Sequence, residues 1–167
     1  VQENKADSGS IIVMDPNTGA VKALVNYPDY DPNNYGSVKA DQYGVFRNRA
    51  ITDLFEPGSG FKVITMAAGI DTGKVKPETT YTDTGNVEAS GKTIYNDAKK
   101  TFGVQTMSDV IQKSLNTGVV FVLKQLGTNP NKITKAGKEV FAGYIKKFGF
   151  GTTTGIELAG EANAKVK

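Results

Sequence analysis

A serine and a lysine stand three residues apart in the stretch "FEPGSGFKVIT", residues 55–65. Positions i and i+3 share a face of a helix, so the Ser59 hydroxyl and the Lys62 amine can come within hydrogen-bonding reach. The apolar residues that follow predict a buried helix, and burial would lower the pKa of Lys62 so that its neutral form can accept the serine proton. Unpaired NH groups at the helix N-terminus would favour a developing oxyanion beside Ser59. The pair is a candidate nucleophile and general base.

A purely structural interpretation explains the same two residues. Serine is a usual N-cap residue, so Ser59 can start the helix, while Lys62 can extend its ammonium group to water. Seven serines and 18 lysines in 167 residues give roughly one S-x-x-K match by chance. The tetrad alone does not separate catalysis from capping.

A second polar motif, "SLN" at residues 114–116, is the only S-x-N in the chain. It falls between two expected helices, so both polar side chains can point into one cleft. There Ser114 would pass a proton between Lys62 and a leaving group, and Asn116 would hold an amide of a peptide substrate. The alternative is that Ser and Asn simply terminate a helix and the following Thr-Gly pair completes its C-cap.

The composition excludes several other chemistries. The chain has no cysteine and no histidine, which rules out disulfides, thiol nucleophiles, zinc held by Cys or His, and every Ser-His-Asp triad. An activated serine must therefore use a lysine or a carboxylate as its base, and no metal or other cofactor is expected. The formal charge of +3 is small and the lysines are dispersed, so no nucleic-acid partner is expected.

The first elements expected along the chain form a hairpin. Two strands at about 10–14 and 20–26 flank the turn sequence "DPNTG", which supplies the fixed φ of proline and a permissive glycine. A polar loop, "DYDPNNYGS", follows them. No run approaches the ~20 apolar residues that span a bilayer.

Helices dominate the expected structure after this loop. The apolar helix after Ser59 should run from 61 to 73, and Thr106 with Asp109 forms a capping-box pattern that should begin another. Two more helices are expected at 119–126 and 134–148. The intervening residues 73–103 predict loops with short strands near 79–82 and 92–95, and residues 149–167 predict a loop.

These motifs together resemble a known family. The segments "EPGSGFK" (56–62), "SLN" (114–116) and "GSIIVMDPNTGAVKALVNYPDYDPNNY" (9–35) are similar to the transpeptidase domain of penicillin-binding proteins. The stretch "NRAITDLFEPGSGFKVIT" most resembles the monofunctional, class B branch, and "TGIELAGEA" resembles the segment after its S-x-N helices. The implied fold class is α+β, with a helical cluster packed on an antiparallel sheet.

The resemblance implies a serine D,D-transpeptidase that cross-links peptidoglycan. Ser59 would attack the D-Ala-D-Ala peptide bond of a stem peptide, with Lys62 as base, Ser114 as proton relay and Asn116 as a ligand of the substrate amide. The backbone NH of Ser59 would supply half of an oxyanion hole. An amine of a neighbouring stem peptide would resolve the acyl-enzyme, and β-lactam antibiotics would trap Ser59.

The same resemblance implies where and with what the protein works. It would act at the extracytoplasmic face of the bacterial cell membrane, with its anchor outside these residues. Cell-division or elongation proteins would be its protein partners.

Two departures from the family pattern stand out. Its third motif, K-[ST]-G, does not occur in this sequence, so residues 1–167 are expected to be the N-terminal portion of a single transpeptidase domain whose remaining strands follow Lys167. Alone, this portion should be a poor catalyst, because losing one oxyanion donor costs about 100- to 1000-fold in rate. The second departure is Gly60, where the family usually has a side chain; glycine in a first helical turn costs up to ~1 kcal/mol.

Other functions on the same fold stay open. A penicillin sensor or a serine β-lactamase shares the S-x-x-K tetrad, although the polar segment 73–103 and the loop "DPNNY" favour the transpeptidase. A non-catalytic scaffold that binds penicillin-like ligands or other cell-wall proteins is the contrasting class. The four intact polar residues argue against a scaffold, whereas Gly60 and the missing motif leave it open.

Overall fold

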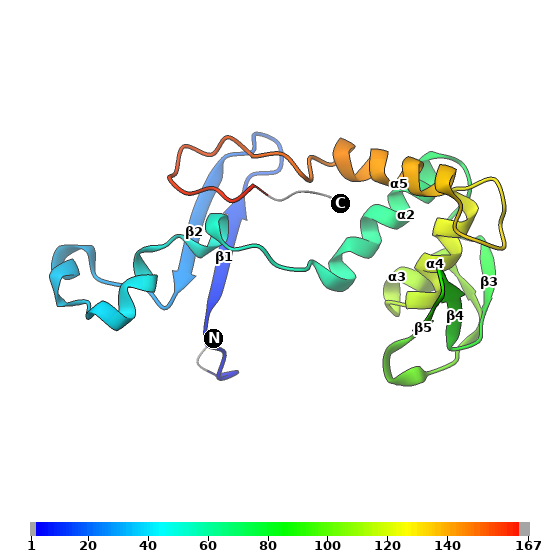
Figure 1. The fold of residues 1–167 in the computed structure, drawn as a ribbon, viewed down its shortest axis with the longest axis horizontal. Coiled ribbons are helices and arrows are strands. Elements are labelled where there is room, and N and C mark those ends of the chain that lie inside the picture. Colours follow the sequence, from blue (N-terminus) through cyan, green and yellow to red (C-terminus); the bar gives the residue numbers. More distant parts are fainter. Residues whose placement is uncertain (1–2, 164–167) are drawn as a thin grey trace. The chain divides into compact units, whose positions relative to one another are not determined.

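The computed structural model describes residues 3–163 and divides into two compact units (Figure 1). Within that range, the first unit contains residues 3–55 and 152–163, and the second contains residues 56–151. Each unit has its own elements. The expected loop at 149–167 has neither helix nor strand as far as residue 163, and its last four residues lie outside the described range.

The first unit is built on a β-hairpin (Figure 1). Strands β1 (Gly9–Met14) and β2 (Val21–Tyr27) pair antiparallel, with a register irregularity at the end of β1. The predicted turn closes the hairpin: the Gly19 N–H donates to the Asp15 carbonyl oxygen at 2.9 Å, and Gly19 has a φ of +73°. Glycine adopts that conformation without steric penalty, so the local sequence suffices to explain the reversal.

Both faces of this hairpin expose apolar side chains. Adjacent residues of a strand point to opposite faces, and both Ile11 and Ile12 are exposed, at 66% and 48%. Val13, Met14 and Val25 are exposed as well. A two-stranded hairpin does not bury enough surface to form a core of its own.

Short helices complete the first unit. The 3-10 helices η1 (Pro32–Ser37) and η2 (Ala40–Phe46) precede the single α-turn α1 (Arg49–Thr52). The Asn26 carboxamide of β2 anchors this last turn, because its Oδ1 accepts the Ala50 N–H at 3.1 Å. The segment from 152 returns to the same place, where the Ala162 N–H donates to the Ile51 carbonyl.

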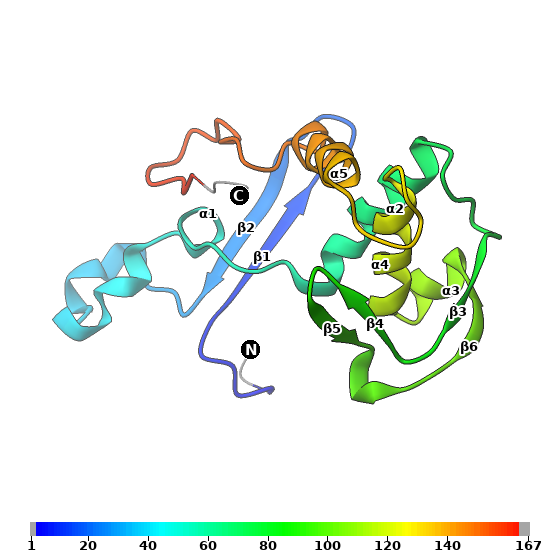
Figure 2. The same ribbon diagram turned by 45° about the vertical axis from the view of Figure 1, so that its right-hand side comes forward.

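Four helices form the body of the second unit: α2 (Lys62–Asp71), α3 (Met107–Gln112), α4 (Asn116–Gln125) and α5 (Lys135–Lys147). Helices α2, α4 and α5 contact one another, and α3 contacts α2 and α4 (Figure 2). The predicted capping box starts α3, with Thr106 and Asp109 bonded reciprocally. The core cluster lies among these helices and consists of Met66, Val75, Met107, Val110, Leu115 and Val122.

Four short strands lie between α2 and α3. Strand β3 (Thr80–Asp83) pairs antiparallel with β6 (Gly103–Thr106), and β4 (Asn86–Ala89) pairs antiparallel with β5 (Lys92–Tyr95). Strands β3 and β5 match the two predicted ones, whereas β4 and β6 were not predicted. The mixture of helices and antiparallel strands confirms the expected α+β class.

Candidate active site

The first residue of α2 contacts the junction between α3 and α4. Lys62 Nζ donates to the Ser114 carbonyl oxygen at 2.5 Å and to Ser114 Oγ at 2.9 Å, across 52 residues of chain. Ser114 has a φ of +56°, a left-handed conformation that is uncommon outside glycine and concentrates at functional sites. In this conformation, the carbonyl and hydroxyl oxygens of one residue both reach the same amine.

The electrostatic setting of Lys62 matches a general base. The side chain is half-buried, and this burial lowers the pKa of Lys62 from its ordinary value of 10.5, because desolvation disfavours the charged ammonium. Its direct polar contacts within residues 3–163 are the two neutral oxygens of Ser114, and it forms no ion pair there. The pKa shift has the direction expected from the sequence.

Ser59 takes a different place from the one expected. It lies in the 3-10 turn η3 (Gly58–Phe61) that precedes α2, and its carbonyl oxygen accepts the Lys62 N–H. Neither η3 nor α2 has a side-chain cap, so the prediction that Ser59 caps the helix is wrong. Its hydroxyl is exposed and forms no hydrogen bond to another described residue, Lys62 included.

The amine of Lys62 is bonded instead to two oxygens from the α3–α4 junction. The Ser59 hydroxyl is left exposed in the turn that immediately precedes the candidate base.

Asn116 is the first residue of α4, and its carboxamide is fixed by a backbone group. Its Nδ2 donates to the Tyr95 carbonyl oxygen at 2.7 Å, while its Oδ1 accepts no hydrogen bond within the described part of the chain. One oxygen acceptor on a side chain held in place can bind the N–H of a peptide amide. The sequence carries no signal for this contact, because any residue supplies a backbone carbonyl.

The C-cap alternative for residues 114–118 is correct for Ser114 and wrong for Thr117 and Gly118. Ser114, in its left-handed conformation, directly follows the last turn of α3: its N–H donates to the Ile111 carbonyl at 3.2 Å, and the Leu115 N–H donates to the Val110 carbonyl at 2.9 Å, as in a Schellman motif. Thr117 and Gly118 instead lie in the first turn of α4. A Cβ atom on Gly118 would lie 2.2 Å from Val110 Cγ2. Glycine is therefore needed here for the close packing of α4 against α3. Gly60 differs, because a Cβ on it would meet nothing within 4 Å.

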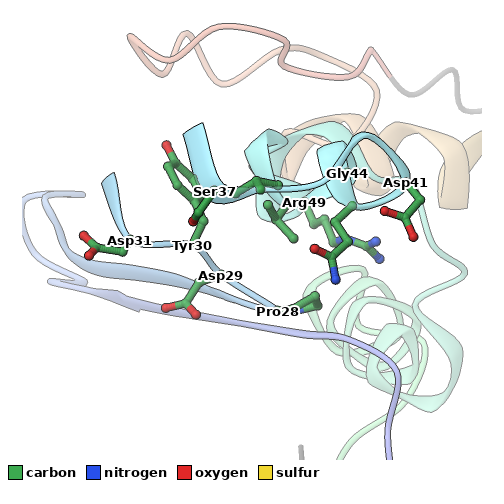
Figure 3. Close-up of a pocket in the computed structure, with 11 residues that line it drawn as sticks. Pro28, Asp29, Tyr30, Asp31, Ser37, Asp41, Gly44 and Arg49 are labelled. Atoms are coloured by element: carbon green, nitrogen blue, oxygen red, sulfur yellow. The ribbon is translucent and has the colours of Figure 1, made fainter. Parts of the chain in front are cut away.

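A cavity of about 510 Å³ in the first unit is not part of this constellation (Figure 3). Asp29, Asp31, Asp41 and Arg49 line it, with Asp31 and Asp41 on opposite sides in Figure 3, and none of the four candidate residues does. The described residues contain no group of three or more carboxylates arranged to hold a metal ion.

Comparison with known proteins decides the family. Residues 9–167 match the model for the penicillin binding protein transpeptidase domain. The chain belongs to this family. The match confirms the family that the S-x-x-K and S-x-N segments suggested, and it extends through both units.

Curated relatives of this transpeptidase family match over most of the chain. Stage V sporulation protein D of Bacillus subtilis (strain 168) is 37% identical over 151 residues, which cover 90% of this chain and 22% of the relative. Peptidoglycan D,D-transpeptidase FtsI of Escherichia coli (strain K12) is 34% identical over 159 residues, covering 95% and 24%. These are class B penicillin-binding proteins, as expected. The chain spans about a quarter of the length of these relatives.

Solved structures of the family have the same fold. Penicillin-binding protein 3 from Mycobacterium tuberculosis, complexed with aztreonam, aligns with a TM-score of 0.82 and 29% identity, over 97% of this chain and 34% of that one. The transpeptidase domain of Burkholderia pseudomallei penicillin-binding protein 3 aligns with a TM-score of 0.78 and 28% identity, over 99% and 41%. Within residues 3–163 of this transpeptidase chain, no helix has the length and apolar character needed to cross a membrane.

Proposed function

We propose that this chain carries the nucleophile, base, proton relay and amide ligand of a D,D-transpeptidase that cross-links peptidoglycan stem peptides. The observation that carries the proposal is the contact of Lys62 Nζ with Ser114 Oγ at 2.9 Å. It joins the S-x-x-K and S-x-N motifs without a histidine. The lowered pKa of Lys62, caused by burial, supports its role as a base.

Acylation of Ser59 then combines a nucleophilic attack with two proton transfers. Ser59 Oγ attacks the carbonyl carbon of the D-Ala-D-Ala peptide bond, and its proton passes to the neutral amine of Lys62. The hydroxyl of Ser114 accepts a proton from Lys62 and donates its own to the leaving nitrogen of the terminal D-Ala. The C–N bond breaks, D-Ala leaves as an amine, and an ester on Ser59 remains.

Deacylation transfers the peptide to a second amine. The amine of a neighbouring stem peptide attacks the ester carbonyl, its proton returns through the same relay, and Ser59 leaves as a hydroxyl. The backbone N–H of Ser59 is one donor to the oxyanion in both halves of the reaction. The free Oδ1 of Asn116 accepts an amide N–H of the stem peptide and orients it.

We further propose that residues 1–167 form the N-terminal portion of a single transpeptidase domain. The solved family members that this chain matches almost completely are two to three times longer than the matched region. A strand bearing a K-[ST]-G motif, contributed from outside these residues, supplies the second oxyanion donor and the site for the substrate carboxylate. The chain alone therefore acylates poorly.

The ligands and location follow from the same assignment. The relatives solved with aztreonam and ampicillin support β-lactams as acylating inhibitors of Ser59. We place the protein at the extracytoplasmic face of the membrane, in contact with division or elongation proteins, because its substrate is assembled into the cell wall there.

Exchange of the terminal D-Ala tests the proposed function. The full-length protein that contains this chain is incubated with a pentapeptide stem and an excess of isotopically labelled D-Ala, and the peptide is analysed by mass spectrometry. We expect labelled D-Ala in the peptide with the wild type and none with Ser59→Ala. Hydrolysis that releases the terminal D-Ala, with no incorporation of labelled D-Ala, would indicate a carboxypeptidase. Absence of both reactions would contradict the enzyme assignment.

A further inference from the structure

A buried carboxylate lies behind the N-terminus of α4. Asp83, at the end of β3, is 1% exposed, and it accepts hydrogen bonds from Thr117 Oγ1 at 2.7 Å and from Asn96 Nδ2 at 2.9 Å. Backbone N–H groups of Gly85 and Phe102 donate to it as well, at 3.1 and 2.8 Å. Burial alone would raise the pKa of Asp83, but these four bonds outweigh it and hold the pKa below its ordinary value.

Asn96 acts as an N-terminal cap for α4 from another segment. The N-cap position of α4 is Leu115, which has no side-chain oxygen, so the first N–H groups of the helix need other acceptors. Asn96 Oδ1 accepts the Thr117 N–H at 3.2 Å. Asn96 is itself 4% exposed, and its amide group faces Asp83. The carboxylate therefore fixes which end of the Asn96 carboxamide meets the helix.

The same segment holds Asn116. The Tyr95 carbonyl oxygen accepts from Asn116 Nδ2 at 2.7 Å, while the next residue, Asn96, binds the backbone of Thr117. Tyr95 and Asn96 thus hold Asn116 and Thr117, the first two residues of α4. Asp83 bonds to one residue of each pair, through Asn96 Nδ2 and Thr117 Oγ1.

We propose that Asp83, acting through Asn96 and Thr117, is a positioning residue that sets the orientation of the Asn116 carboxamide. It holds the Asn116 Oδ1 toward the amide of the stem peptide, without touching substrate itself. The proposal rests on the proposed function, in which Asn116 is the ligand of that amide. The Asn116 carboxamide is bonded to the Tyr95 carbonyl, and a side chain that is held before the substrate arrives loses little freedom when it binds.

Thr117 offers a conservative way to test this coupling. Thr117→Val removes the hydroxyl and keeps the shape, whereas Thr117→Ser keeps the hydroxyl. In the full-length protein, acylation by a labelled penicillin with an amide side chain is measured for both variants, alone and combined with Asn116→Ala. Thr93→Val, which removes the exposed hydroxyl that contacts Glu88, is the matched control.

We expect Thr117→Val to lower the second-order acylation rate about tenfold in the wild-type background and less than about twofold with Asn116→Ala, because coupled residues are not additive. Thr117→Ser and Thr93→Val should stay near the wild-type rate. An equal loss in both backgrounds would overturn the proposal, because Thr117 would then act independently of Asn116.

A measurement without acylation separates this proposal from the proposed function. Hydrogen exchange of the Thr117 backbone amide and the Asn116 side-chain amide is followed in the wild type and in Asp83→Ala, under conditions in which the two proteins are equally stable. Asn96 Nδ2 and Thr117 Oγ1 both donate to Asp83 Oδ1, and Asp83→Ala removes this shared acceptor, so we expect at least tenfold faster exchange at both sites. Unchanged protection would overturn the positioning role. Failure of penicillin to label the wild type would overturn only the proposed function, and exchange would still decide the role of Asp83.

Discussion

Lys62 Nζ lies 2.9 Å from Ser114 Oγ, although 52 residues separate the two in the chain. The same amine is held by the carbonyl oxygen of Ser114 at 2.5 Å. The contact joins the first turn of α2 to the α3–α4 junction, and it places a hydroxyl that can both accept and donate a proton on the candidate base. The contact supports the proposed proton relay between Lys62 and a leaving group in a chain that has no histidine.

Replacing Ser114 by alanine tests the relay. Ser114→Ala removes the hydroxyl but leaves the carbonyl that anchors Lys62, so the fold should persist while proton delivery to the leaving group fails. We expect the penicillin acylation rate of the full-length protein to fall about 10²- to 10⁴-fold. Ser108→Ala removes another exposed hydroxyl, which bonds to the Pro77 carbonyl at 3.3 Å, and should leave the rate unchanged. Equal rates for the two variants would exclude Ser114 as the relay.

The pH dependence of acylation tests the role of Lys62. Only the neutral amine accepts a proton, and burial lowers the pKa of Lys62 below its ordinary value of 10.5. Acylation should therefore slow as the pH falls through this lowered pKa and level off above it. We expect the pH at which the acylation rate falls to half its maximum to lie below 10.5. Lys62→Arg should abolish acylation over the whole pH range, since a guanidinium stays charged and cannot accept the proton of Ser59. A midpoint at or above 10.5 would contradict the role.

Alanine substitutions at two helical glycines should change the free energy of unfolding in opposite directions. Gly118→Ala places a Cβ 2.2 Å from Val110 Cγ2, and overpacking of this kind destabilises by about 1–3 kcal/mol. Gly143→Ala in α5 meets nothing within 4 Å, so its greater helix propensity should stabilise by about 0.5–1 kcal/mol. Urea unfolding monitored by circular dichroism measures both. Changes of the same sign would show that α3 and α4 do not pack as closely as described.

Gly60 tests whether the turn beside Ser59 requires glycine. Its φ lies outside the left-handed region, and a Cβ would enter open space. Gly60→Ala should raise the free energy of unfolding by up to about 1 kcal/mol. The acylation rate should stay within about threefold of wild type, since the hydroxyl of Ser59 is untouched. A much larger loss in rate at unchanged stability would mean that substrate approaches the backbone at this glycine.

The elements that the sequence predicted are those with local signals. The turn from Asp15 to Gly19 and the capping box of Thr106 and Asp109 are determined within a few residues. Strand β6 escaped prediction because its partner, β3, lies on the far side of the β4–β5 hairpin. Strand β4 was missed although it pairs locally with β5 across Ser90 and Gly91, because Val87 is its only β-branched residue.

The site followed the same division. The residue types and order of the two motifs identified Ser59, Lys62, Ser114 and Asn116 as candidates, and the expected proximity of Lys62 and Ser114 is observed. The expected bond between Ser59 and Lys62 is absent from the described residues, where the amine of Lys62 is bonded to Ser114 instead. The partner of Asn116 is a backbone carbonyl, and the buried network around Asp83 depends on strands that were not predicted.

The central claim is that Ser59 is the acylated nucleophile. The full-length protein is treated with a labelled penicillin, digested, and analysed by mass spectrometry to locate the adduct. We expect one adduct, on the peptide that contains Ser59, and none in Ser59→Ala. An adduct on another residue, or equal labelling of Ser59→Ala, would contradict the claim.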